Sequence, residues 1–265
     1  MMNRRQLSSS VLFSCVLFLV ACGQTAPARN ARLELAADHS QSAQRAYNRG
    51  EYHVALGQYE MALQADVAVE NISGIATDML NLARVNLMLG RQEAANAYLD
   101  TLLQDSALEY GKPFMAAAAT QKSLLLIKQG DASGARLWLE KASAWCVAEC
   151  TLVSVIDGAR AAIALREKDA EKALHWADRA ASASRGDSPL EYANALRYMS
   201  EARLMRGEFS VALQLAVEAL AVDKSLGLPA KIRLDLLLSA AASEGLGDAE
   251  QAMRFRERAS RIVAR

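Results

Sequence analysis

Small and apolar residues recur along the chain at fixed distances from turn-forming residues. The turn residues stand at positions 50, 90, 130, 168, 207 and 247, which are 38 to 40 residues apart. Each is followed five positions later by Ala, and seven positions after that by Ala or Leu. Because seven residues make two helical turns, both positions lie on one face of a helix. The pattern predicts that each turn is followed by a helix that packs closely on the preceding helix through a small residue.

Six such turns predict six helical hairpins, or about twelve helices. Ala and Leu dominate the sequence and only 4 of its 265 residues are Pro, which is a helix-forming composition. One hairpin cannot bury its apolar face alone, whereas stacked hairpins can. We therefore expect an all-α fold, an α-solenoid over residues 33–265. A generic helical bundle with accidental periodicity is the alternative, and six turns in register argue against it.

The repeat is clearest in the first and fifth units. The matching residues are Gly50-Glu51-Tyr52 with Ala55, Tyr59 and Ala62, and Gly207-Glu208-Phe209 with Ala212 and Ala219. This pattern resembles the tetratricopeptide repeat. The resemblance implies a right-handed superhelix of hairpins that binds other proteins.

The chain departs from that family in its period and its prolines. The period is near 39 residues rather than about 34. Pro113, Pro189 and Pro229 precede turns by 17 or 18 residues, which suits the first turn of the next unit's first helix. We expect the extra residues to lengthen the helices or the links. Lys168 replaces the turn Gly of the fourth unit, so a related α-solenoid class remains an alternative for units three and four.

The N-terminus has the features of an export signal. Arg4 and Arg5 precede an apolar run over residues 11–20, which is too short to span a bilayer. The run ends in Leu19-Val20-Ala21-Cys22, which resembles the bacterial lipobox. The resemblance implies cleavage before Cys22, which then carries a diacylglycerol and an N-acyl lipid. An ordinary signal peptide with a chance cysteine is the alternative, and Arg4-Arg5 is only weakly similar to a twin-arginine signal.

The resulting organisation is a signal peptide (1–21), a lipidated Cys with a short tether (22–32) and the solenoid (33–265). Gly23 and Gln24 follow the cysteine, in place of the Asp that retains many lipoproteins at the inner membrane. By resemblance we expect lipid anchoring at the periplasmic face of the outer membrane. A tether of about ten residues reaches at most about 35 Å, so the solenoid stays near its membrane.

Cys146 and Cys150 lie in the link between the third and fourth units. An exported chain meets an oxidising compartment, so we favour a structural disulfide over free thiols. On a helix, the two Cβ atoms would be about 5–6 Å apart, whereas a disulfide needs about 3.8 Å. The bond therefore requires a non-helical link. A redox-active pair is disfavoured because it lacks the usual two-residue spacing.

No motif for catalysis or metal binding is apparent. His39, His53 and His175 fall in different units, without metal-ligand spacing. The sequence has no phosphate-binding loop and no nucleophile elbow, so we expect neither an enzyme nor a cofactor. The formal net charge is zero, which gives no reason to expect a nucleic-acid partner.

In tetratricopeptide proteins the first helix of each unit lines an inner groove, at positions 13, 10, 6 and 3 before the turn. The resemblance assigns to partner binding Gln44, Tyr47, Thr77, Leu80, Arg84, Leu87, Thr120, Leu124, Ile127, Asn194, Arg197 and Glu201. The same counting adds Val155, Leu165, Leu204, Leu234, Leu237 and Glu244. The groove is apolar in the middle and polar toward its ends, which suits an extended or helical peptide. Longer helices would shift this register.

The expected function is therefore a periplasmic scaffold or activator that docks another envelope protein. By resemblance, the candidate processes are activation of a peptidoglycan synthase and assembly of the type IV pilus secretin. A cell-wall-binding or cell-wall-processing protein and a self-associating structural lipoprotein are the alternatives.

Overall fold

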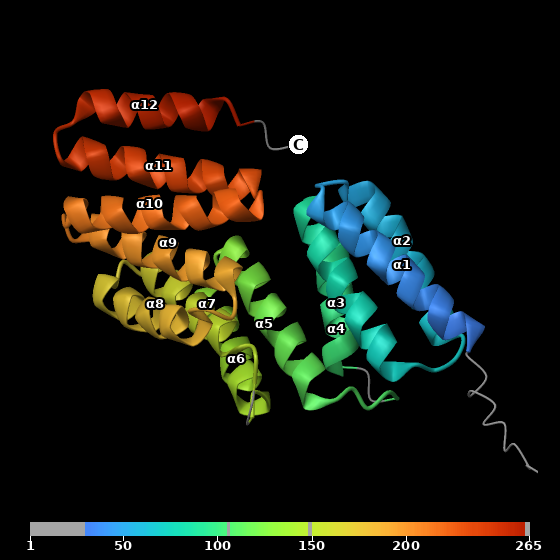
Figure 1. The fold of residues 1–265 in the computed structure, drawn as a ribbon. Coiled ribbons are helices and arrows are strands. Elements are labelled where there is room, and N and C mark those ends of the chain that lie inside the picture. The colour runs from blue at the N-terminus through green and yellow to red at the C-terminus, as the bar shows by residue number, and fades with distance from the viewer. Residues whose placement is uncertain (1–29, 105–106, 148–149, 263–265) are drawn as a thin grey trace, which may run out of the picture. The chain divides into compact units, whose positions relative to one another are not determined.

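The structure, a computed structural model, describes residues 30–104, 107–147 and 150–262. Cys22 and the predicted signal peptide lie outside the described residues. The described part contains twelve helices and no strand (Figure 1). They are α1 (Ala31–Asn48), α2 (Tyr52–Val67), α3 (Ile72–Met88), α4 (Gln92–Gln104), α5 (Lys112–Gln129), α6 (Ala132–Trp145), α7 (Val153–Arg166), α8 (Ala170–Ser184), α9 (Pro189–Met205), α10 (Phe209–Leu226), α11 (Pro229–Gly245) and α12 (Ala249–Ser260). The chain is an α-solenoid of six hairpins, as the repeat predicts.

All six predicted turns lie between the two helices of a hairpin. The five turn glycines have positive φ, and Lys168 adopts the same conformation with φ 62°. After each turn the next N–H donates to a carbonyl five residues back, for example Asp131 N to Leu126 O and Asp169 N to Ala164 O, both 2.9 Å. This Schellman bond satisfies a carbonyl at the end of the first helix. The fourth unit therefore has the same turn geometry as the others.

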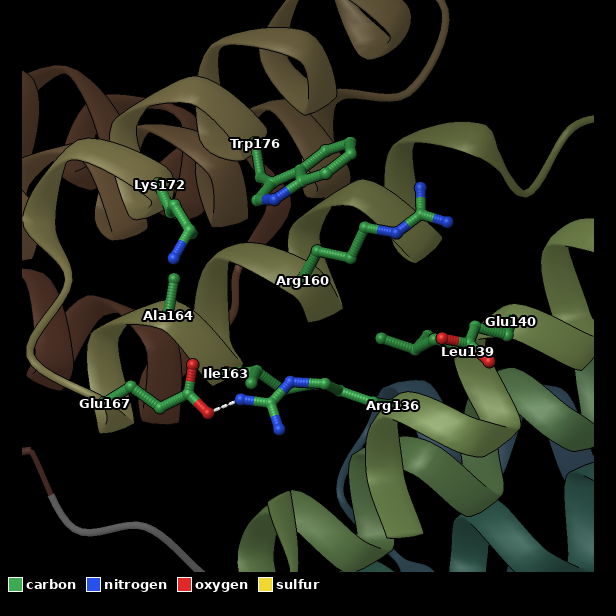
Figure 2. Close-up of a pocket in the computed structure, with 9 residues that line it drawn as sticks. All are labelled: Arg136, Leu139, Glu140, Arg160, Ile163, Ala164, Glu167, Lys172 and Trp176. Carbon is green, nitrogen blue, oxygen red and sulfur yellow. Dashed lines mark ion pairs between the residues drawn. The ribbon is translucent and has the colours of Figure 1, made fainter. Parts of the chain in front are cut away.

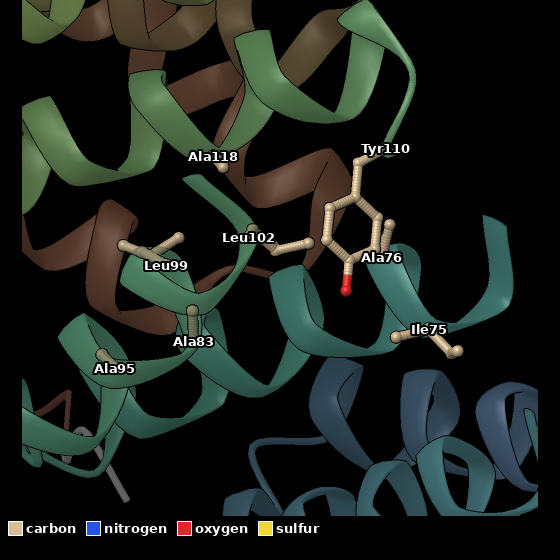
Figure 3. Packing of buried hydrophobic residues seen from close by; sticks show 8 residues of the cluster. All are labelled: Ile75, Ala76, Ala83, Ala95, Leu99, Leu102, Tyr110 and Ala118. Atoms are coloured by element: carbon tan, nitrogen blue, oxygen red, sulfur yellow. The ribbon is translucent and has the colours of Figure 1, made fainter. Parts of the chain in front are cut away.

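The recurring small residues form the contact between the helices of each hairpin. The Ala five positions after each turn is 0 or 1 % exposed, and so is the Ala or Leu seven positions further on. Figure 3 shows one such core, in which Ala95 of α4 lies near Ala83 of α3 and Leu102 of α4 points toward Ala76 of α3. Small side chains let two helix backbones approach closely, which is why this pattern predicts the hairpins correctly.

The extra length of the repeat lies in both the helices and the links. The helices have 12 to 18 residues. Pro113, Pro189 and Pro229 stand in the first turn of α5, α9 and α11, as predicted. The described part of the chain has no helix that is long and apolar enough to cross a membrane.

The link between α6 and α7 contains a disulfide. The sulfurs of Cys146 and Cys150 are bonded, with the two Cα atoms 5.2 Å apart. Helix α6 ends at Trp145, and Cys146 leaves the helical conformation with ψ 76°. The link is thus non-helical at Cys146, the condition that the spacing of the two cysteines requires.

Two junctions between neighbouring units contain a pair of buried aspartates at equivalent repeat positions. Asp223 of α10 and Asp235 of α11 both bind Arg197 of α9. Asp66 and Asp78 form the corresponding pair between α2 and α3, and there Ser40 occupies the position of the arginine. The Ser40 hydroxyl donates to Asp78 Oδ1 at 2.7 Å. Burial raises the pKa of Asp78 to about 7, and the neighbouring carboxylate of Asp66 adds to the rise.

Candidate functional site

The first helices of successive units line the inner face of the solenoid. Contacts join α3 to α5, α5 to α7, α7 to α9 and α9 to α11, whereas none joins consecutive second helices in the described part of the chain. Helices that pack more closely along a stack lie on its inner side. The inner face is therefore the surface on which the partner-binding residues are expected.

In the first two units, the expected residues contact one another. Arg84 donates to Gln44 Oε1 at 2.9 Å, and its guanidinium lies 4.4 Å from the ring centre of Tyr47. Tyr59, which the groove prediction does not include, donates to the same Gln44 oxygen at 3.1 Å. Burial raises the pKa of Tyr47. These side chains form a polar bridge between units one and two.

Other expected residues take part mainly in packing. Leu80 and Leu87 pack against the core of the second unit, and Leu124 packs against the core of the third. Thr77 is exposed, and its hydroxyl donates to the Ser73 carbonyl within α3.

Two residues that were expected on the groove surface, Arg197 and Thr120, are instead buried in the interior. The side chain of Arg197 is 6 % exposed and binds Asp223 and Asp235, with 2.6 Å between Arg197 Nε and Asp235 Oδ1. Thr120 is 2 % exposed and donates to the Ala116 carbonyl. Asn194 is half-buried and accepts hydrogen bonds from Arg197 and Lys231. The position ten before the turn is therefore covered by neighbouring helices in units three and five and does not lie on the groove surface.

A pocket on the inner face, here called the inner pocket, is built by three successive units. It holds about 280 Å³ and is lined by Ile127, Ala162, Leu165, Arg166, Tyr198 and Glu201. Three of these residues, Ile127, Leu165 and Glu201, were expected from the sequence. Helices α5, α7 and α9 all contribute, so the pocket exists only in the stacked array.

Tyr198 and Arg166 are inner-face residues that the sequence reasoning missed. Tyr198 stands nine positions before its turn and Arg166 stands two positions before its turn, whereas the expected groove positions were ten and three before the turn. The signal that could have found them is a one-residue shift of the helical face. Gly158 of α7 lies against the tyrosine, since a Cβ there would be in contact with the ring, 3.4 Å from Tyr198 Cε2. Burial raises the pKa of Tyr198 to about 12.

Glu201 is a half-buried carboxylate in this mostly apolar setting. Burial raises its pKa, and the positive charge of Arg197 opposes the rise only in part. Within the described part of the chain, Glu201 has neither a hydrogen-bond partner nor an ion-pair partner. The pocket therefore contains an acid that the fold itself does not neutralise.

A second pocket, here called the outer pocket, lies between α6, α7 and α8 (Figure 2). It holds about 190 Å³. Its three cations already have acidic neighbours: Arg136 pairs with Glu167, Arg160 with Asp157 at 2.7 Å, and Lys172 with Asp169 at 2.7 Å. Arg160 also lies 4.6 Å from the ring centre of Trp176. Because these charges are satisfied internally, we place the candidate site in the inner pocket.

Contrary to the expectation, the histidines do not each fall in a different unit, because His39 and His53 both belong to the first hairpin. His39 Nδ1 lies 2.9 Å from Gln58 Oε1, between α1 and α2. His53 and His175 are exposed on α2 and α8. Among the described residues, no group of three or more His, Cys, Asp or Glu is arranged to hold a metal ion.

The fold is similar to several solved structures. A Rap protein complexed with competence and sporulation factor has a TM-score of 0.64 and 13 % identity over 86 % of this chain. The apo form of RapI has a TM-score of 0.62 and 13 % identity over 86 %. This chain spans 65 % of the length of each Rap chain. BtubC from P. vanneervenii has a TM-score of 0.53 and 19 % identity, with 88 % of this chain and 91 % of that chain covered.

No family model matches the sequence, and no curated protein matches it. At such low identities the structural likeness shows the fold alone. The chain is thus an α-solenoid of tetratricopeptide-like hairpins.

Proposed function

We propose that this protein is an exported, lipid-anchored interaction scaffold whose inner face binds a peptide segment of another envelope protein. The observation that carries the proposal is the inner pocket, which three units build from mostly apolar residues, an exposed arginine and an unpaired acid. Stacked helical hairpins offer extended inner surfaces of this kind to partners. The fold likeness to a Rap protein complexed with competence and sporulation factor supports the proposal.

The partner pathway that we propose is activation of a peptidoglycan synthase or assembly of the type IV pilus secretin. The support is the resemblance to lipoproteins of this repeat class, which serve both processes. Anchoring at the periplasmic face of the outer membrane would bring the inner face within reach of either machinery.

The anchor is tested by replacing the proposed lipid-bearing residue, Cys22→Ser. We expect the variant to lose incorporation of radiolabelled palmitate and to leave the membrane fraction. The replacement Cys15→Ser is the matched control, because Cys15 lies inside the apolar run and not at its end. Undiminished palmitate labelling of Cys22→Ser would contradict the proposed anchor.

The binding surface is tested by blocking the inner pocket with Ala162→Arg. Ala183→Arg on α8 is the matched control, since Ala183 is exposed and lies outside both pockets. Affinity capture from crosslinked cells is expected to lose one envelope protein with Ala162→Arg and to keep it with Ala183→Arg. Thermal melting of both variants checks that they fold.

Other outcomes of this test favour the alternatives. Capture of the same proteins by both folded variants would contradict a partner site in the inner pocket. Purified protein that binds or cleaves isolated peptidoglycan would instead favour a cell-wall protein. A stable large oligomer at low concentration would favour a self-associating lipoprotein.

A further inference from the structure

The inner pocket combines an apolar floor with the half-buried carboxylate of Glu201 and, at an exposed position, the guanidinium of Arg166. Ile127 and Leu165 supply aliphatic surface, and Tyr198 supplies an aromatic ring. Glu201 stands beside them, half-buried and without a partner in the described residues. A carboxylate removed from water is costly unless a cation or a hydrogen-bond donor compensates it. The composition of the pocket therefore indicates what chemistry a ligand must bring.

The cations near Glu201 do not supply this compensation. Arg197 lies one helical turn earlier, but its guanidinium is bound by Asp223 and Asp235 in the interior. Arg166 lines the same pocket, yet it forms no ion pair with Glu201 and does not contribute to the shift of the Glu201 pKa. Arg197 therefore compensates Glu201 only in part, and a partner can supply a positive charge that pairs with it.

We propose that the inner pocket binds a lysine or arginine side chain of the partner segment, with the aliphatic stem on Ile127 and Leu165 and the charge on Glu201. This inference rests on the proposed function and specifies its partner. Lysine and arginine bury their methylene groups along apolar surfaces while the charged head meets a polar group. The face of an aromatic ring such as Tyr198 also attracts a cation.

Other side chains fit the pocket less well. An acidic side chain would place a second negative charge beside Glu201. A purely apolar side chain would complete the burial of Glu201 without giving it a partner, which costs more than the apolar contact contributes. A basic side chain satisfies the floor and the acid together.

The probes for a test are n-butylammonium, which mimics the end of a lysine side chain, and the neutral n-butanol. The full chain in detergent micelles is labelled at isoleucine and leucine methyl groups, and each probe is titrated against the signals of Ile127 and Leu165. We expect n-butylammonium to shift both signals saturably. Glu201→Gln is expected to weaken its binding by about fivefold, the effect of one partly exposed ion pair. The binding of n-butanol should not depend on residue 201.

The matched control is Glu140→Gln, because Glu140 is an exposed acid that lines the outer pocket. It should leave n-butylammonium binding unchanged. Equal affinity of n-butylammonium for wild type and Glu201→Gln would overturn the inference, and so would equal shifts by both probes. If Ala162→Arg still abolishes capture of the partner in that case, the scaffold function stands and only the basic side chain is rejected.

Discussion

At the scale of single residues, Lys168 is the exception among the turns. It adopts a left-handed conformation that five glycines adopt at the equivalent positions. A side chain at positive φ costs about 1 kcal/mol or more, so Lys168→Gly is expected to raise the free energy of unfolding by about 1 kcal/mol. Urea denaturation measures the change. Gly130→Ala is the converse control and should destabilise the chain, whereas a destabilised Lys168→Gly would show that the turn is not strained.

Asp78 makes the stability of the first two units depend on pH. Its pKa in the folded chain is about 7, against 3.8 for an ordinary Asp, so the folded state holds a proton that the unfolded chain releases. The stabilisation is fully present below the unfolded pKa and is lost as pH rises through the folded one. One pKa unit is worth about 1.4 kcal/mol, so the loss between pH 4 and pH 7 is at most about 4 kcal/mol.

The replacement Asp78→Asn isolates this contribution. Asn keeps the shape of the protonated acid and can still accept from Ser40. We expect the variant to be more stable than wild type at pH 8 and close to it at pH 4, as measured by urea denaturation at each pH. If the difference in free energy of unfolding between wild type and Asp78→Asn is the same at pH 4 and pH 8, titration of Asp78 is ruled out.

Arg197 compensates the equivalent acids at the junction of units five and six. Removing it by Arg197→Met takes from the buried Asp223 and Asp235 the arginine that binds both of them, which is expected to cost about 3–5 kcal/mol. A second change, Asp235→Asn, should recover part of this loss in the double variant. The free energies of unfolding of the four chains form a cycle, and a double variant no more stable than Arg197→Met would contradict the pairing.

At the scale of helices, the hairpins could be predicted from the sequence because their signals are local. The turn residues and the small contact residues recur every 38 to 40 positions, and each acts on its own hairpin. The inner face was predicted only in part. Whether the position ten before a turn faces outward, as Leu237 does, or inward, as Arg197 does, depends on how the next unit packs against the helix. How one unit packs on the next is a tertiary property that the local pattern does not contain. For this reason Tyr198 was missed and Arg197 was misplaced.

Gly158 couples the packing of α7 and α9 to the shape of the inner pocket. Gly158→Ala brings an ordinary contact with Tyr198 and improves helix propensity, so we expect up to about 1 kcal/mol of stabilisation. Gly158→Leu is expected to displace the Tyr198 ring and to destabilise the chain by about 1–3 kcal/mol. Thermal melting measures stability, and the NMR signals of the Tyr198 ring report on its position. A fully tolerated leucine would mean that α7 and α9 do not pack closely here.

At the scale of the whole molecule, the solenoid presents two different faces. The inner face carries a pocket with a half-buried, unpaired acid, whereas the three cations of the outer pocket are paired internally. A stack of similar units makes such a contrast possible, because each unit adds one helix to each face. We therefore expect a partner to contact one face and not the other.

A photo-crosslinking amino acid placed at Arg166 or at Lys172 tests this claim most directly. Both residues are exposed cations, and they line the inner and the outer pocket respectively. In living cells, irradiation is expected to join one envelope protein to the chain labelled at position 166 and none to the chain labelled at position 172. Equal adducts from both positions, or adducts from position 172 alone, would contradict a partner site on the inner face.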